Sequence, residues 1–141
     1  MKKIIARCGF RCDLCPAYVQ NSSTAADRIS GAAGWSKYFR LKVAPASMRC
    51  YGCLAEKGKG FEFPAGDCAV NCCVVKGNLA NCSECGDYPC KALNERMTGV
   101  EKVIKRFRNK IPKKEFDRFI APYDARTTLG KLRHTVGSNG R

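Results

Sequence analysis

The sequence is poor in histidine and in long apolar runs, and both shortages exclude classes of protein. His134 is the only histidine among 141 residues, so zinc fingers with two histidine ligands and HExxH metalloproteases are excluded. His134 lies beside Lys131, Arg133 and Gly137, where we interpret it as a solvated residue and not as a catalytic base. No stretch approaches the roughly 20 apolar residues that span a bilayer, so no membrane association is predicted.

The N-terminus lacks the pattern of an export signal. Residues 1–3 carry two lysines and residues 4–6 are apolar, but Arg7 follows at once. A signal peptide needs an apolar region of roughly 7 to 15 residues. We therefore expect a cytoplasmic protein, in which dense cysteines indicate metal or redox chemistry and not disulfides. The 11 cysteines are also an odd number, which complete disulfide pairing would not accommodate.

Cysteine is absent from residues 91–141, and this absence divides the chain. We predict a cysteine-rich metal-binding region over residues 1–92 and a basic helical part over residues 93–141, packed together as one domain. The formal net charge is +14, and two zinc ions held by four thiolates each would lower it to roughly +10. The protein is basic in either state and would attract polyanions.

The predicted elements are few. A helix is expected from about residue 23 to 39, after an N-cap at residues 22–24, with Trp35, Tyr38 and Phe39 in the core. Residues 48–90 indicate turns, short strands and metal-binding knuckles. No internal repeat is evident. The predicted fold class is a small irregular α+β domain with zinc-ribbon-like cysteine knuckles and C-terminal amphipathic helices.

The C-terminal part has a clear helical periodicity. Apolar residues recur at intervals of three and four at Leu93, Met97, Val100, Ile104, Phe107 and Ile111. Pro112 should end this helix, and a short second helix should follow over residues 113–120 with Phe116, Phe119 and Ile120 inward.

The polar face of this periodic segment is basic, with Lys102, Lys105, Arg106 and Arg108. A solvated helix face explains the pattern fully. The functional alternative is a surface that binds nucleic acid or an acidic protein through phosphate or carboxylate groups. No phosphate-binding loop is present, and the sequence leaves the identity of any small-molecule ligand unknown.

The cysteines form four clusters. Their positions are Cys8, Cys12 and Cys15, then Cys50 and Cys53, then Cys68, Cys72 and Cys73, and finally Cys82, Cys85 and Cys90. Two cysteines separated by two residues can point both thiolates at one ion from a single turn, and two such turns complete a tetrahedral zinc site. In the last cluster, Gly86 is expected to take positive φ and to leave backbone N–H groups facing sulfur.

Four clusters predict about two zinc ions. Sequential pairing assigns Cys12, Cys15, Cys50 and Cys53 to one ion, and Cys68, Cys72, Cys82 and Cys85 to the other. The remaining Cys8, Cys73 and Cys90 are additional or substitute ligands. A crossed arrangement stays open, because the different loop lengths change the closure entropy by only about 0.8 kcal/mol.

The predicted function is that of a non-catalytic zinc-binding protein, and three alternatives remain. The first is an iron–sulfur cluster, since thiolate ligands suit both metals. The spacing of Cys8, Cys12 and Cys15 also occurs in radical enzymes that use S-adenosylmethionine, but this chain is too short for their barrel. The second is a dithiol oxidoreductase, although residues 54–66 form a poor helix. The third is a thiol sensor at Cys73 or Cys90.

Four segments together resemble a family of short prokaryotic proteins catalogued as a domain of unknown function, number 3795. These segments are Cys8-Gly-Phe-Arg-Cys-Asp-Leu-Cys-Pro-Ala-Tyr18, Cys50-Tyr-Gly-Cys53, Cys68-Ala-Val-Asn-Cys72 and Asn81-Cys-Ser-Glu-Cys-Gly-Asp-Tyr-Pro-Cys-Lys-Ala-Leu93. Phe10 and Cys73 depart from the pattern. The resemblance covers about residues 8–93 and implies a metal-binding cysteine-rich fold without an assigned activity, substrate or partner.

Overall fold

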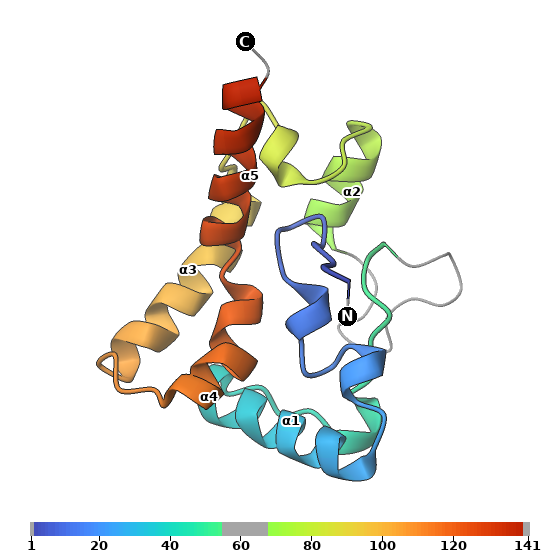
Figure 1. The fold of residues 1–141 in the computed structure, drawn as a ribbon, viewed down its shortest axis with the longest axis vertical. Coiled ribbons are helices and arrows are strands. Elements are labelled where there is room, and N and C mark those ends of the chain that lie inside the picture. The colour runs from blue at the N-terminus through green and yellow to red at the C-terminus, as the bar shows by residue number, and fades with distance from the viewer. Residues whose placement is uncertain (1, 55–67, 140–141) are drawn as a thin grey trace.

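The computed structural model describes residues 2–54 and 68–139, and this part of the chain is mainly helical (Figure 1). Its α-helices are α1 (Ala25–Phe39), α2 (Ala69–Lys76), α3 (Lys91–Arg106), α4 (Lys113–Glu115) and α5 (Ala125–Asn139). Six shorter turns connect them: η1 (Cys12–Leu14), η2 (Val19–Asn21), η3 (Pro45–Ser47), η4 (Cys82–Glu84), η5 (Phe116–Ile120) and η6 (Ala121–Tyr123).

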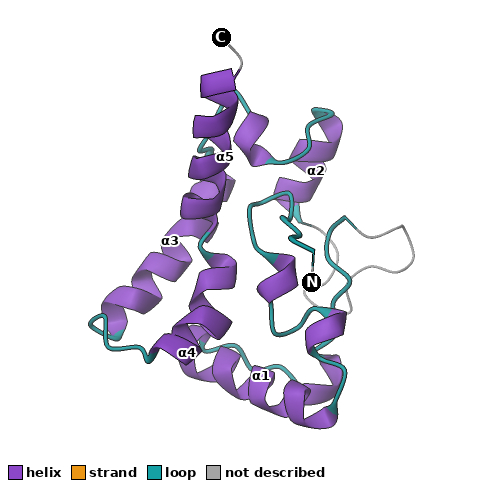
Figure 2. Cartoon of the chain, in the orientation of Figure 1, coloured by secondary structure: helices purple, strands orange, loops and turns teal. Residues whose placement is uncertain are grey.

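The predicted α+β, zinc-ribbon-like fold is wrong. The described residues contain no strand (Figure 2), and their β-structure is limited to two isolated bridges, Ile5 with Arg11 and Tyr18 with Cys50. Two physical reasons account for this. The predicted knuckles are single 3₁₀ turns and not hairpins, and the apolar piece expected as a strand forms α2, with Val70 and Val74 buried on one face.

Helix α1 begins at a complete capping box. The Asp27 N–H donates to Thr24 Oγ1 at 3.0 Å, and the Thr24 N–H donates to the Asp27 carboxylate at 3.4 Å. These two bonds satisfy N–H groups that the first helical turn leaves unpaired. Trp35 and Tyr38 are buried on the inner face, which confirms the predicted helix and its core aromatic residues.

Helix α3 follows the predicted periodicity over its first three turns. Leu93, Met97 and Val100 are buried. The helix ends at Arg106, and Arg108 and Asn109 then take left-handed conformations with φ of 53° and 59°. The predicted extension to residue 111 is therefore wrong.

Gly99 lies inside the continuous helix α3, where no neighbouring atom requires a glycine. We therefore expect its replacement by alanine to stabilise the protein. An added Cβ would meet no atom within 4 Å, so Gly99→Ala should gain roughly 0.5 to 1 kcal/mol of unfolding free energy from helix propensity. Urea unfolding at equilibrium measures this change. Gly130→Ala on α5, where the added Cβ also meets nothing, should show a gain of the same sign. A loss of stability in both variants would contradict the open space seen around these glycines.

The chain after Pro112 is helical but irregular. The short helix α4 leads into the π-helical turn η5 and the 3₁₀ turn η6, and the longer α5 then continues to Asn139. Phe119 and Ile120 are buried and Phe116 is partly buried, as predicted for residues 113–120. Helix α5 was not predicted, and its inner face includes Ala125 and Leu129, both fully buried.

The core consists of two clusters that each combine residues from the cysteine-rich and the basic part. One cluster joins Trp35 and Tyr38 of α1 to Val100 of α3 and to Phe119. The other joins Cys8 and Cys82 to apolar residues of α2, α3 and α5. In Figure 1, α3 and α5 lie along one side, α1 crosses the lower end, and α2 and the N-terminal segment lie on the side opposite α3 and α5. The turn η4, which begins at Cys82, packs against α5.

Candidate metal centre

Six cysteines from three separate segments line one large cavity. They are Cys8, Cys12, Cys15, Cys50, Cys53 and Cys68. The cavity has a volume of about 570 Å³, and Phe10, Trp35 and Tyr123 form part of its wall. The four cysteines assigned to one ion by sequential pairing thus face the same space, together with two further thiols.

Local turns position the four thiols of this predicted ion. The Cys15 N–H donates to the Cys12 carbonyl at 3.2 Å, closing the 3₁₀ turn η1. Side chains three residues apart eclipse in a 3₁₀ turn, so both sulfurs project from the same side. In the second segment Gly52 has φ of +81°, and its N–H donates to Cys50 Sγ at 3.3 Å. A second backbone group, the Arg7 N–H, donates to Cys53 Sγ at 3.3 Å.

A buried hydroxyl supports Cys15. Tyr123 Oη lies 3.0 Å from Cys15 Sγ and accepts a hydrogen bond from Trp35 Nε1 at 2.9 Å. When Cys15 is a thiolate, the Tyr123 hydroxyl provides the hydrogen between these two atoms. The contact joins η1 to η6 and α1, far apart in the sequence.

We expect Tyr123→Phe to destabilise the protein by about 1 to 3 kcal/mol, because the buried Trp35 Nε1–H loses the acceptor described here. Guanidinium unfolding monitored by tryptophan fluorescence measures the change. Tyr51→Phe is a matched control, because Tyr51 is half-buried and its hydroxyl contacts only the exposed Arg49 at 3.4 Å among the hydrogen bonds described. Equal stability of the two variants would contradict a structural role for the Tyr123 hydroxyl.

Burial raises the pKa of the Cys12, Cys15 and Cys50 thiols and favours their protonated state. The pKa of Cys12 is raised mainly by burial, and further by the neighbouring sulfurs of Cys53, Cys15, Cys50 and Cys8. Burial also raises the pKa of Cys50 to about 11, with smaller contributions from Cys15 and Cys53. Several thiolates this close repel one another unless a cation lies between them. Metal binding would therefore displace the protons.

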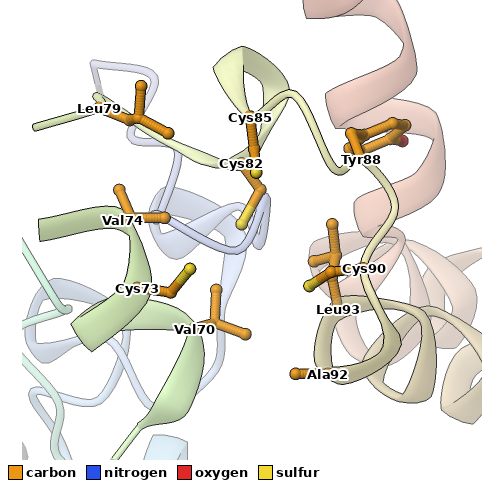
Figure 3. A pocket seen from close by; sticks show the side chains of 10 residues that line it. All are labelled: Val70, Cys73, Val74, Leu79, Cys82, Cys85, Tyr88, Cys90, Ala92 and Leu93. Carbon is orange, nitrogen blue, oxygen red and sulfur yellow. The ribbon is translucent and has the colours of Figure 1, made fainter. Parts of the chain in front are cut away.

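Four other cysteine positions surround a second, smaller pocket (Figure 3). Cys73 of α2, Cys82 and Cys85 at η4, and Cys90 before α3 line a pocket of about 80 Å³. The pKa of Cys82 is raised to about 12, mainly by burial and further by the sulfurs of Cys8, Cys90, Cys85 and Cys73. The sequence grouped Cys82 and Cys85 with Cys68 and Cys72, but Cys68 lines the larger cavity.

The turn at Cys82 and Cys85 is held from two sides. Asn81 caps η4 by accepting from the Ser83 N–H at 2.9 Å, and the Asp87 N–H donates to Cys85 Sγ at 3.4 Å. From α5, Arg133 donates to the carbonyl oxygens of Ser83 and Cys85 at 3.0 and 2.9 Å. The expected positive φ at Gly86 is wrong: among the described glycines, Gly9 after Cys8 and Gly52 before Cys53 take that conformation.

The two cysteine turns are copies of one conformation. Residues 12–18 and 82–88 both read Cys-x-x-Cys-x-x-Tyr. In each, the second cysteine N–H donates to the first cysteine carbonyl, at 3.2 and 3.1 Å. The N–H groups of Tyr18 and Tyr88 then donate to the second cysteine carbonyl, at 3.1 and 3.3 Å. The expectation of no internal repeat missed this signal, which the tyrosines make visible in the sequence.

Three cysteines, Cys8, Cys68 and Cys72, belong neither to the four of the predicted first ion nor to the four of the smaller pocket. Cys8 is buried in the same core cluster as Cys82, and it also lines the larger cavity together with Cys12. Cys68 Sγ accepts from Arg96 Nη2 at 2.9 Å. The side chain of Cys72 lies outside the described residues. Among the side chains that are described, no three candidate ligands are already gathered closely enough to hold an ion, so the ligand assignments stay predictions.

Fold and cysteine positions together define a small helical cysteine-rich protein in which two groups of cysteines each line a cavity. The family described as "Protein of unknown function (DUF3795)" matches residues 4–95, about two thirds of the chain, and the protein belongs to this family. Comparison with curated proteins and with solved structures gave no match. Within residues 2–54 and 68–139, no helix is long and apolar enough to cross a bilayer.

Proposed function

We propose that this protein is a non-catalytic zinc-binding protein whose first centre is formed by Cys12, Cys15, Cys50 and Cys53. The observation that carries the proposal is their convergence on one cavity from two turns, each with its backbone shaped around the cysteines. Four thiolate ligands without an open position are typical of structural zinc. The ion would join the N-terminal segment to the chain before α2.

Elemental analysis tests the proposal on full-length protein purified anaerobically without added metal. We expect about two zinc ions per chain, if the second group of thiols also binds, and no visible absorption. The double variant Cys12→Ser/Cys15→Ser should lose about one zinc ion. Cys68→Ser is the matched control, because Cys68 lines the same cavity outside the proposed set. Unchanged zinc in the double variant would overturn the ligand assignment.

An iron–sulfur cluster is the second candidate, and the size of the cavity favours it. Six thiols surround about 570 Å³, which is more space than a single ion requires. Iron with an equal amount of sulfide, together with a brown colour lost in air, would establish this candidate. Protein without metal that forms a reversible disulfide under mild oxidation would instead indicate a thiol redox function.

The basic segment from the last turn of α3 to the start of α4 supports a second role, the binding of a nucleic-acid backbone. Residues 102–114 contain seven exposed basic side chains and no acidic one. Of these, Lys113 pairs with Asp117 at 2.9 Å and Arg106 donates to the Tyr38 carbonyl. We propose that the others contact phosphates, which gives salt-dependent and sequence-independent affinity.

Fluorescence anisotropy with a single-stranded oligonucleotide tests this role. Lys105→Glu/Arg108→Glu should weaken binding at least tenfold at low salt and flatten the salt dependence. Lys2→Glu/Lys3→Glu is the control, because it changes the net charge equally at the other end of the sequence. Equal losses in both variants would indicate attraction by net charge alone and would exclude a binding face here.

A further inference from the structure

We propose a second zinc centre with the ligands Cys73, Cys82, Cys85 and Cys90. This inference extends the proposed function to a site with its own ligands, and its metal class rests on that function. Neither the spacing of the cysteines nor the family match assigns these four residues to one ion. The proposal replaces Cys68 and Cys72 of the sequence-based grouping by Cys73 and Cys90.

The first argument is convergence. The four thiols come from α2, from both ends of the η4 turn and from the residue preceding α3, and Figure 3 shows their sulfur atoms directed toward the space between these elements. The other side chains in the wall are Val70, Val74, Leu79, Tyr88, Ala92 and Leu93. Because nearly the whole wall apart from sulfur is apolar, the sulfur atoms are the groups available to bind a ligand there.

The second argument is size. In a tetrathiolate site the zinc–sulfur distance of about 2.3 Å places neighbouring sulfurs about 3.8 Å apart. A pocket of about 80 Å³ has room for one such ion. Since the described thiols are not yet at coordinating separations, zinc would draw α2, η4 and the start of α3 together. The pocket is far smaller than the cavity at the first centre and suits a single ion.

The third argument is the environment around the turn. A zinc ion with four thiolates carries a net charge of about −2, which needs donors and cations nearby. The Asp87 N–H already donates to Cys85 Sγ. The Arg133 guanidinium donates to the Ser83 and Cys85 carbonyls and stacks on the Tyr88 ring at 4.6 Å. One positive charge from α5 is thus fixed beside the proposed centre.

The position of Cys68 argues against it as a ligand of the second centre. Its sulfur accepts from Arg96 and lines the larger cavity together with Cys12 and Cys53. Cys73 instead lines the same pocket as Cys82, Cys85 and Cys90.

Zinc analysis of two matched double variants tests the proposal. Cys82→Ser/Cys85→Ser and Cys12→Ser/Cys15→Ser change equivalent turns, and each should retain about one of two zinc ions. X-ray absorption on Cys12→Ser/Cys15→Ser should then show four sulfur neighbours around the remaining zinc. Two zinc ions retained by Cys82→Ser/Cys85→Ser, or nitrogen and oxygen neighbours in the absorption spectrum, would overturn the second centre. Absence of zinc from the unmodified chain would instead overturn the proposed function.

Single variants on α2 decide which cysteine completes the site, even if a double variant fails to fold. Cys73→Ser should accelerate zinc transfer to a chromogenic chelator at least tenfold for one of the two ions. Cys72→Ser and Cys68→Ser are the matched controls and should leave this rate unchanged. Acceleration by Cys72→Ser or Cys68→Ser without an effect of Cys73→Ser would contradict the ligand set.

Discussion

Removal of zinc with a chelator under reducing conditions is expected to unfold this protein or to lower its melting temperature by tens of degrees. Structural zinc contributes roughly 10 to 16 kcal/mol in small zinc-binding peptides, whereas a whole domain has a net stability of only about 5 to 15 kcal/mol. The N-terminal segment before α1 contains only single turns and isolated bridges. Its position therefore depends on contacts made around the cysteines.

Circular dichroism during thermal unfolding measures this effect. Readdition of zinc should restore the original transition, whereas magnesium should not, because thiolate ligands disfavour it. A melting curve that is the same with and without metal would show that the helices pack without help from an ion. That result would contradict the structural role of both proposed centres.

Gly34→Ala is expected to destabilise the protein by about 3 kcal/mol or more. An added Cβ at residue 34 would lie 2.1 Å from two ring carbons of Phe119, which is itself buried. The ring and the helix backbone would have to separate, and overpacking of this kind costs about 1 to 3 kcal/mol, occasionally more. The gain in helix propensity, about 1 kcal/mol, is too small to offset it.

Gly31→Ala on the same helix is the matched control. Its Cβ would meet the terminal methyl of Met48 at 3.0 Å, and a flexible methionine can move aside. We therefore expect a change within about 1 kcal/mol for this variant. Urea unfolding of both variants at equal metal content measures the difference. Similar stabilities would show that Phe119 does not pack directly on residue 34.

Helices with strong local signals were predictable from the sequence, and the others were not. Helix α1 has a capping box, and the first turns of α3 have a clear apolar stripe. Helix α5 has weaker signals. Asp124 precedes it and accepts from the Thr127 N–H at 3.3 Å, but threonines at residues 127–128 and Gly130 lower its helix propensity. Its formation depends on tertiary burial of Leu129, which lies against Gly9 at the other end of the chain.

The fold class was mispredicted because the cysteines and glycines between residues 48 and 90 indicated turns, short strands and metal-binding knuckles. Val70 and Val74 are four residues apart, which is helical spacing, but the cysteines between them obscured the pattern. Cysteine is apolar enough to occupy a helix face and reactive enough to bind metal. Its spacing alone does not distinguish these uses.

For the candidate site, the sequence identified cysteines as the candidate ligands but did not decide which cysteines share an ion. Cys12, Cys15, Cys50 and Cys53 share one cavity as the sequential pairing requires, whereas Cys68 and Cys82 line different ones. The contributions of Tyr123 and Arg133 had no signal in the sequence, because both lie in the cysteine-free part. Only the three-dimensional structure brings them to the two turns.

The contacts of Tyr123 and Arg133 set the order in which the protein can mature during its synthesis. Every cysteine is synthesised before these two residues, and at about 5 to 20 residues per second the 43 residues from 91 to 133 take roughly 2 to 9 s. For that interval the nascent thiols lack the hydroxyl and the guanidinium that later cover them. A metal ion bound by the cysteine turns at this stage would protect the thiols from oxidation. Helix α5 would then pack against turns that are already folded.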